Sequence, residues 1–126
     1  MSKTYELVRD FVEEKKFKVI NDDGENIVFN YQMNKIFFFK IDEENFVSMI
    51  LPDFAEVNEE NYSDVVMNCN RLNEKLQQVK LYTTGDFIVA SSEFYYLGKE
   101  DLVFQIQMSL DNLVAAKVRY QKIAGL

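Results

Sequence analysis

Three segments of the chain repeat apolar side chains at the spacing of an amphipathic α-helix. Residues 4–15 alternate apolar and charged positions with that period, and a second such segment begins near residues 58–61 and ends at about Leu76. The third extends from about Lys99 to Ile123, with acidic residues at its start and basic residues near its end, which complements the helix dipole. The pattern therefore predicts three helices, the last of them the longest.

Six shorter segments have the alternation and the bounding turn residues of β-strands. Four of them follow the first helix, and two lie between the second and third helices. In chain order they cover residues 17–20, 27–31, 35–41, 46–51, 79–83 and 87–91, while residues 94–97 form either an apolar loop or an extension of the last strand. Their connections are short, as in hairpins. The prediction is an α+β fold with a single antiparallel sheet and the element order α-β-β-β-β-α-β-β-α.

The composition is that of one globular domain covering residues 1–126. The length is close to the usual size of a single domain, and 48% of the residues are apolar, which is enough for one core. The N-terminal segment lacks the apolar run of a secretory signal peptide. The only cysteine, Cys69, falls on the apolar stripe of the second helix, where we expect a buried thiol. These features predict a cytoplasmic protein.

The charges are distributed unevenly along the chain. The net charge is −7, and no Lys or Arg occurs between Lys40 and Arg71, where eight carboxylates lie. These are Asp42, Glu43, Glu44, Asp53, Glu56, Glu59, Glu60 and Asp64. Such a distribution argues against binding to a nucleic-acid backbone or to an anionic membrane, because both need a basic surface. The stretch is either a solvated acidic face or a surface that steers a basic partner.

The residue types needed for common catalytic and metal sites are missing. The chain has no histidine and one cysteine, so it has no Ser-His-Asp or Cys-His arrangement and no thiolate zinc site. Its four glycines are far apart and form no phosphate-binding loop. Two carboxylate pairs, Asp42 with Glu43 or Glu44 and Glu59 with Glu60, lie in strongly polar segments where we expect them to be exposed. We therefore expect a protein that is not an enzyme and holds no cofactor or metal.

The strand predicted at residues 35–41 is apolar on both faces. Ile36 and Phe38 point one way, while Phe37, Phe39 and Ile41 point the other. Helices can cover both faces, or a partner can bury the second one. The candidate partner-binding residues are Phe37, Phe39, Ile41 and Met49. The last helix also has a second apolar stripe, formed by Phe104, Met108, Ala115 and Val118.

The end of the second helix resembles a known family. The segment Cys69-Asn70-Arg71-Leu72-Asn73 is similar to the helix-ending N-x-x-N element of the YbjN family of bacterial sensory transduction regulators, and the later strands and the long last helix continue the pattern. The resemblance implies a strongly curved antiparallel sheet like that of type III secretion chaperones, often dimeric and without known catalysis. On their residue types alone, Asn70 and Asn73 are amides that cap the helix or bond the next connection.

These observations favour a cytoplasmic, non-catalytic protein-binding module, chaperone-like or regulatory, that forms a homodimer. Two other hypotheses stay open. One is a small-molecule-binding or enzymatic domain with a pocket between the sheet and the last helix, lined by Tyr82, Phe94, Tyr95 or Tyr96. The other is an acidic antagonist of a basic protein, whose affinity would depend on salt.

Overall fold

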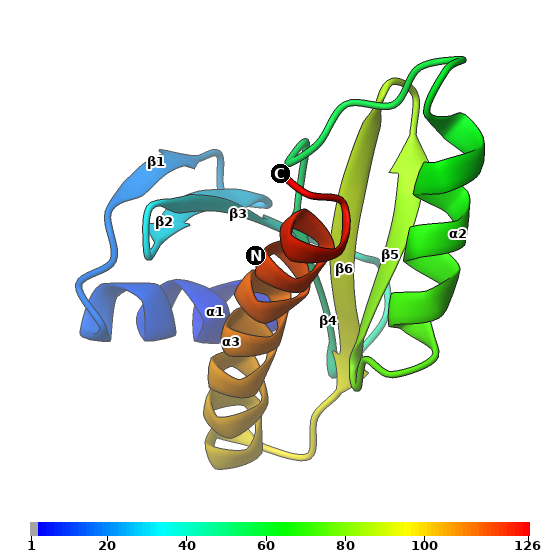
Figure 1. Ribbon diagram of the computed structural model, residues 1–126. Coiled ribbons are helices and arrows are strands. Elements are labelled where there is room, and N and C mark those ends of the chain that lie inside the picture. Colours follow the sequence, from blue (N-terminus) through cyan, green and yellow to red (C-terminus); the bar gives the residue numbers. More distant parts are fainter. Residues whose placement is uncertain (1–2) are drawn as a thin grey trace.

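A computed structural model describes residues 3–126 and has nine helices and strands in that range (Figure 1). In chain order these are α1 (Lys3–Glu14), β1 (Val19–Asp22), β2 (Ile27–Tyr31), β3 (Asn34–Phe39), β4 (Phe46–Leu51), α2 (Tyr62–Asn73), β5 (Val79–Thr84), β6 (Phe87–Tyr95) and α3 (Lys99–Ile123). The predicted order of elements is confirmed. Residues 94 and 95 extend the last strand, which was one of the two alternatives.

The six strands form one sheet in the order β1-β2-β3-β4-β6-β5, and every neighbouring pair is antiparallel. The chain leaves the sheet after β4, forms α2, and returns with the β5–β6 hairpin. Figure 1 shows that the sheet bends strongly, so that α1 and α3 lie inside the bend and α2 runs alongside β5. The predicted α+β fold with a curved antiparallel sheet is confirmed.

The pairing register decides which side chains point into the bend. Phe38 pairs with Ile27 on one side and with Met49 on the other, so these three residues share the inner face. All three are at most 1% exposed and belong to one continuous hydrophobic core, which also takes in the apolar stripe of α1. Burial of this inner face against α1 and α3 holds the sheet and helices together.

The same register corrects the prediction for Met49. Phe37 pairs with Ile50, and Met49 is fully buried on the inner face, so the prediction that Met49 joins Phe37 and Phe39 on one surface is wrong. Ile50 takes that position instead. The strand at residues 46–51 is apolar on both faces. The length of the loop formed by residues 40–45 fixes the register of β4, and the register decides which side chains face inward.

Both edges of the sheet are protected against pairing with another strand. At the β5 edge, Nδ2 of Asn73 donates a hydrogen bond to the Leu81 carbonyl at 2.9 Å, and the Leu81 amide donates one to Oδ1 of Asn73 at 2.7 Å. At the other edge, β1 has only four residues and its register shifts at Ile20, which is a β-bulge. A short bulged strand and a side chain that replaces a strand partner both discourage edge pairing. Asn73 thus reaches past the connection that follows α2 and bonds strand β5 itself.

Candidate protein-binding surfaces

The outer face of the sheet, on the side opposite α1 and α3, carries a group of large apolar side chains. We call it the outer aromatic face; by strand alternation and register it consists of Val28, Phe37, Phe39, Phe46, Ile50, Tyr82, Phe87 and Tyr95. Two ring pairs pack across it, Phe37 with Phe39 at 6.0 Å between centroids and Phe46 with Tyr95 at 4.8 Å. The face therefore carries aromatic side chains from β3, β4, β5 and β6, together with Val28 of β2 and Ile50 of β4.

Several of these side chains remain open to solvent. Tyr95 is 60% exposed and Phe39 37% exposed, while Phe37 and Ile50 are half-buried between their neighbours. The structure thus brings Phe37 and Phe39 together on this face, as the sequence predicted. Ile41 lies two residues beyond the end of β3 and is 39% exposed.

A polar row crosses the middle of the outer aromatic face. Ser91 pairs with Ile50 on one side and with Lys80 on the other. Its hydroxyl is buried and has no hydrogen-bond partner among residues 3–126. Beside it, Lys80 and Glu93 form an ion pair with a distance of 3.3 Å between Nζ and Oε1. An unpaired buried hydroxyl is costly, which makes Ser91 the least satisfied polar group of this surface.

The acidic stretch of the sequence does not form one surface. Asp42, Glu43 and Glu44 lie in the loop before β4, whereas Asp53 to Asp64 follow it, in the connection to α2 and in the first turn of that helix. Because β4 is six residues long, the two groups lie about 20 Å apart at opposite ends of the strand. The outer aromatic face therefore lies between two acidic ends. The carboxylate pairs at Asp42–Glu44 and Glu59–Glu60 are exposed, as predicted.

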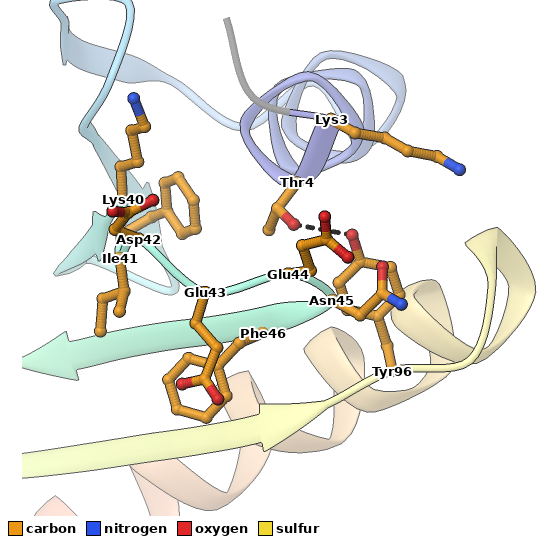
Figure 2. A pocket seen from close by; sticks show the side chains of 11 residues that line it. Lys3, Thr4, Lys40, Ile41, Asp42, Glu43, Glu44, Asn45, Phe46 and Tyr96 are labelled. Carbon is orange, nitrogen blue, oxygen red and sulfur yellow. Dashed lines mark hydrogen bonds between the residues drawn. The ribbon is translucent and has the colours of Figure 1, made fainter.

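A pocket of about 490 Å³ opens at the first of these acidic ends (Figure 2). Residues from the start of α1, the β3–β4 loop and the end of β6 line it, and Thr4 and Tyr96 share a hydrogen bond of 2.7 Å inside it. The Tyr95 hydroxyl donates a hydrogen bond to Glu43 from the outer face. In residues 3–126 no group of three or more Cys, Asp or Glu side chains is placed to hold a metal ion. The pocket is thus a polar, solvent-open depression.

The four aromatic residues proposed to line a small-molecule pocket do not lie together. Tyr82 and Tyr95 point outward and are 38% and 60% exposed, while Phe94 and Tyr96 are buried. Successive residues of a strand point to opposite faces, so Phe94 and Tyr95 cannot share one cavity between the sheet and α3. Of the four alternatives, Tyr82 and Tyr95 are therefore excluded from a cavity between the sheet and α3, while Tyr96 lines the pocket beside the β3–β4 loop.

A second hollow of about 680 Å³ lies between α2 and the end of α3. Tyr120 forms part of its wall, and burial, followed by the nearby Cys69, raises the pKa of its phenol. Cys69 is itself buried, and this burial raises the pKa of its thiol, so the inert thiol predicted from the sequence is confirmed in position. The sequence contained no signal for this hollow, because its walls come from two segments that are far apart in the chain, residues 55–71 and 120–126.

The outward side of α3 forms a second apolar surface. Phe104 is 65% exposed, Val118 55% and Met108 42%, and Ala115 is also exposed. These are the residues of the second stripe that the sequence indicated. They lie opposite the buried stripe that faces the sheet, so nothing within residues 3–126 requires them to be apolar.

Comparison with known proteins shows the fold. No protein-family model matches the chain, and no curated protein sequence is significantly similar to it. Among solved structures it is similar to the crystal structure of YbjN from E. coli, which is described as a candidate transcription regulator. The TM-score is 0.73 at 10% sequence identity, over 94% of this chain and 92% of that one. The chain has a YbjN-like fold. The resemblance noted at the end of the second helix is thereby confirmed for the architecture.

None of the helices in residues 3–126 has the length and apolar character needed to cross a bilayer. Two surfaces expose several large apolar side chains: the outer aromatic face, which lies between acidic segments, and the outward stripe of α3.

Proposed function

We propose that this chain is a non-catalytic protein-binding module with a regulatory or chaperone-like role, and that its partner docks on the outer aromatic face. One observation carries the proposal: large aromatic side chains such as Phe39 and Tyr95 remain exposed on a sheet face that lies on the side opposite α1 and α3. Exposed groups of large apolar side chains mark interaction sites, and aromatic residues are enriched where binding energy concentrates.

The protected edges favour docking on the face over addition of a strand. Asn73 occupies the backbone groups of Leu81 at the β5 edge, and the bulge at Ile20 interrupts the β1 edge. A partner that added a strand would have to displace the Asn73 side chain from β5 or straighten the bulge in β1. A partner that packs its own apolar side chains against Phe37, Phe39 and Ile50 needs neither change.

The acidic ends of β4 indicate the charge of the partner. Three carboxylates lie at one end of the outer aromatic face and five at the other, so a segment with apolar residues between two basic ends fits best. This view includes the hypothesis of an acidic antagonist, since a basic protein offers such segments. YbjN of E. coli, with the same fold, is described as a candidate regulator, which supports a regulatory role.

Affinity capture from native lysate tests the docking surface. We expect the wild type to retain a partner that Phe39→Asp loses, because the new carboxylate would have to be desolvated in the interface. Met33→Asp is the matched control: Met33 is 99% exposed in the β2–β3 turn, away from the outer aromatic face, and should leave capture unchanged. Circular dichroism verifies that both variants are folded. Equal capture by Phe39→Asp and the wild type would refute this docking site.

Salt dependence tests the chemistry of the partner. We expect the retained partner to elute as ionic strength rises from about 0.05 M to about 0.5 M, since the screening length of exposed charges falls from about 14 Å to about 4 Å over this range. Retention that does not respond to salt would exclude the basic partner while leaving the docking surface itself intact.

We also propose that the chain is a cytoplasmic homodimer. The exposed apolar stripe of α3 supports self-association, because a monomer gains nothing from leaving Phe104 and Val118 in water. Light scattering across the micromolar range measures the molar mass directly. A wild type that stays monomeric at every concentration would contradict the dimer and would leave the protein-binding proposal standing.

A further inference from the structure

The outward stripe of α3 has the composition of an interface and the position of a solvent-facing surface. The helix is 25 residues long, and its buried stripe against the sheet includes Leu102, Ile106, Leu110, Leu113, Ala116 and Tyr120. An ordinary surface helix carries charged residues on the opposite side. Here the opposite side carries Glu100, Phe104, Met108, Asp111, Ala115, Val118 and Lys122, all of them exposed, with the charges mainly at the two ends.

The spacing of this stripe is that of a two-helix seam. From Phe104 to Lys122 its members follow one another at steps of four, three, four, three and four residues. Such alternation averages 3.5 residues and keeps a stripe facing a second helix that winds around it with a left-handed twist. A stripe meant only for solvent has no reason to keep this period over five steps.

The charges along the stripe determine the orientation of the second helix. Glu100 and Asp101 occupy the first turn of α3, while Arg119 and Lys122 lie near its end. If a second copy of α3 packs antiparallel, the acidic turn of each helix meets the basic turn of the other, and the two helix dipoles oppose each other favourably. A parallel arrangement would bring acid against acid and base against base.

The side-chain sizes agree with the same orientation. The larger members, Phe104 and Met108, lie in the first half of the stripe, and the smaller ones, Ala115 and Val118, in the second half. Antiparallel packing places large residues against small ones at every level, which fills the seam evenly. Parallel packing would crowd the rings at one end and leave space at the other.

The only charge in the middle of the stripe is already engaged within the chain. Asp111 accepts a hydrogen bond from the Tyr31 hydroxyl, which also accepts one from Nε2 of Gln107 at 3.1 Å. These contacts hold the carboxylate toward the end of β2. Each copy of Asp111 near a twofold axis therefore keeps a hydrogen-bond donor from its own chain, and the repulsion between the two carboxylates is the one unfavourable contact of the seam.

We propose that two copies of this chain associate through antiparallel packing of α3 on α3, along the stripe from Glu100 to Lys122. The inference rests on the homodimer part of the proposed function and names its interface. A twofold axis near Asp111 makes the surface self-complementary, as a closed dimer requires. The outer aromatic face lies on the far side of the sheet from α3, so each subunit of this dimer keeps its docking surface open.

Light scattering on the full chain at matched concentrations tests the interface. We expect the wild type to have the mass of a dimer at tens of micromolar and Phe104→Asp to have the mass of a monomer. The circular dichroism of the variant should be unchanged, because Phe104 is exposed within its own chain and contributes little to the fold. Phe39→Asp changes the other surface with the same substitution and should remain dimeric. If Phe104→Asp stays dimeric, the inference is overturned and the homodimer stands; if the wild type is monomeric at all concentrations, both fail.

Disulfide crosslinking tests the orientation independently. In a Cys69→Ala background, a single cysteine placed by Asp111→Cys should crosslink the dimer on mild oxidation, because residues near an antiparallel twofold axis meet their own copy within bonding distance. A single cysteine placed by Lys122→Cys should not, since the two copies would lie at opposite ends of the seam. Crosslinking at residue 122, or at neither position in a proven dimer, would overturn the antiparallel arrangement.

Discussion

Replacing Asn73 with alanine should lower the stability of the protein by an amount that its contacts allow us to work out. The side chain makes two hydrogen bonds to the backbone of Leu81, at 2.7 Å and 2.9 Å, and Leu81 is only 3% exposed. Removal leaves an amide and a carbonyl without these partners at a poorly hydrated position. Each bond contributes about 1 kcal/mol net, so the loss is about 2 kcal/mol.

The neighbouring asparagine of the same motif provides a matched control. Asn70 lies three residues earlier in α2 and is exposed. Alanine is a better helix former than asparagine by about 0.5 kcal/mol inside a helix, a gain that is small beside the expected loss and smaller still at Asn73, the last residue of α2. The difference between Asn73→Ala and Asn70→Ala therefore isolates the contribution of the Leu81 contacts, and we expect it to be about 2 kcal/mol.

Urea unfolding followed by circular dichroism measures this difference. With a slope of about 1.5 kcal/mol per molar urea, the midpoint of Asn73→Ala should fall about 1.3 M below that of Asn70→Ala. The variant should also aggregate faster on storage, because its β5 edge is exposed. A difference in stability below about 0.5 kcal/mol, the range of neutral surface substitutions, would refute the role we assign to Asn73.

Two further predictions concern polar groups of the described structure. Ser91→Ala should raise the urea midpoint, because it removes a buried hydroxyl that lacks a hydrogen-bond partner in residues 3–126 and costs about 1 kcal/mol; a lower midpoint would contradict this. Burial, followed by the hydrogen bond to Asp111, raises the pKa of Tyr31, so its contribution to stability is complete below the unfolded pKa near 10 and is lost as pH rises through the higher folded value. The free energy of unfolding should therefore fall from about pH 10 upward, and less steeply in Tyr31→Phe; equal slopes would show that Tyr31 does not carry this dependence.

The sequence was sufficient for the order of the elements because each local signal agreed with the tertiary structure. The helix of residues 99–123 has dipole-matched ends and a strong apolar stripe, and the short connections allowed only hairpins between most strands. Two strands have the predicted bounds, and the ends of the other four differ by up to four residues, as at the first strand, which begins at Val19 and not at residue 17. There Lys16 takes a positive φ after α1 and Phe17 stacks on Phe29, so the chain enters the sheet only at Val19.

The candidate site was predictable only in part, because the deciding information is the pairing of distant residues. For Phe37 and Phe39 the alternation within one strand was enough to place them on one face. For Met49 it was not, since the strand at residues 46–51 is apolar on both sides and only its register with β3 and β6 assigns the faces. The separation of the acidic stretch into two groups has the same cause. The two groups are close in sequence, but β4 runs between them and holds them at its opposite ends.

The two apolar surfaces looked like one signal in the sequence, and the fold separates them. Phe39 and Phe104 lie on opposite sides of the sheet–helix layer, so one partner surface cannot cover both residues of the same molecule. A protein that leaves two such surfaces uncovered gains solubility only if each has an occupant. In our proposal a second copy covers the stripe of α3, because the charges at the two ends of that stripe are self-complementary. A basic partner covers the outer aromatic face, because the acidic ends of that face would repel a second copy. The proposal thus places dimerisation and partner binding on different faces of the same small domain.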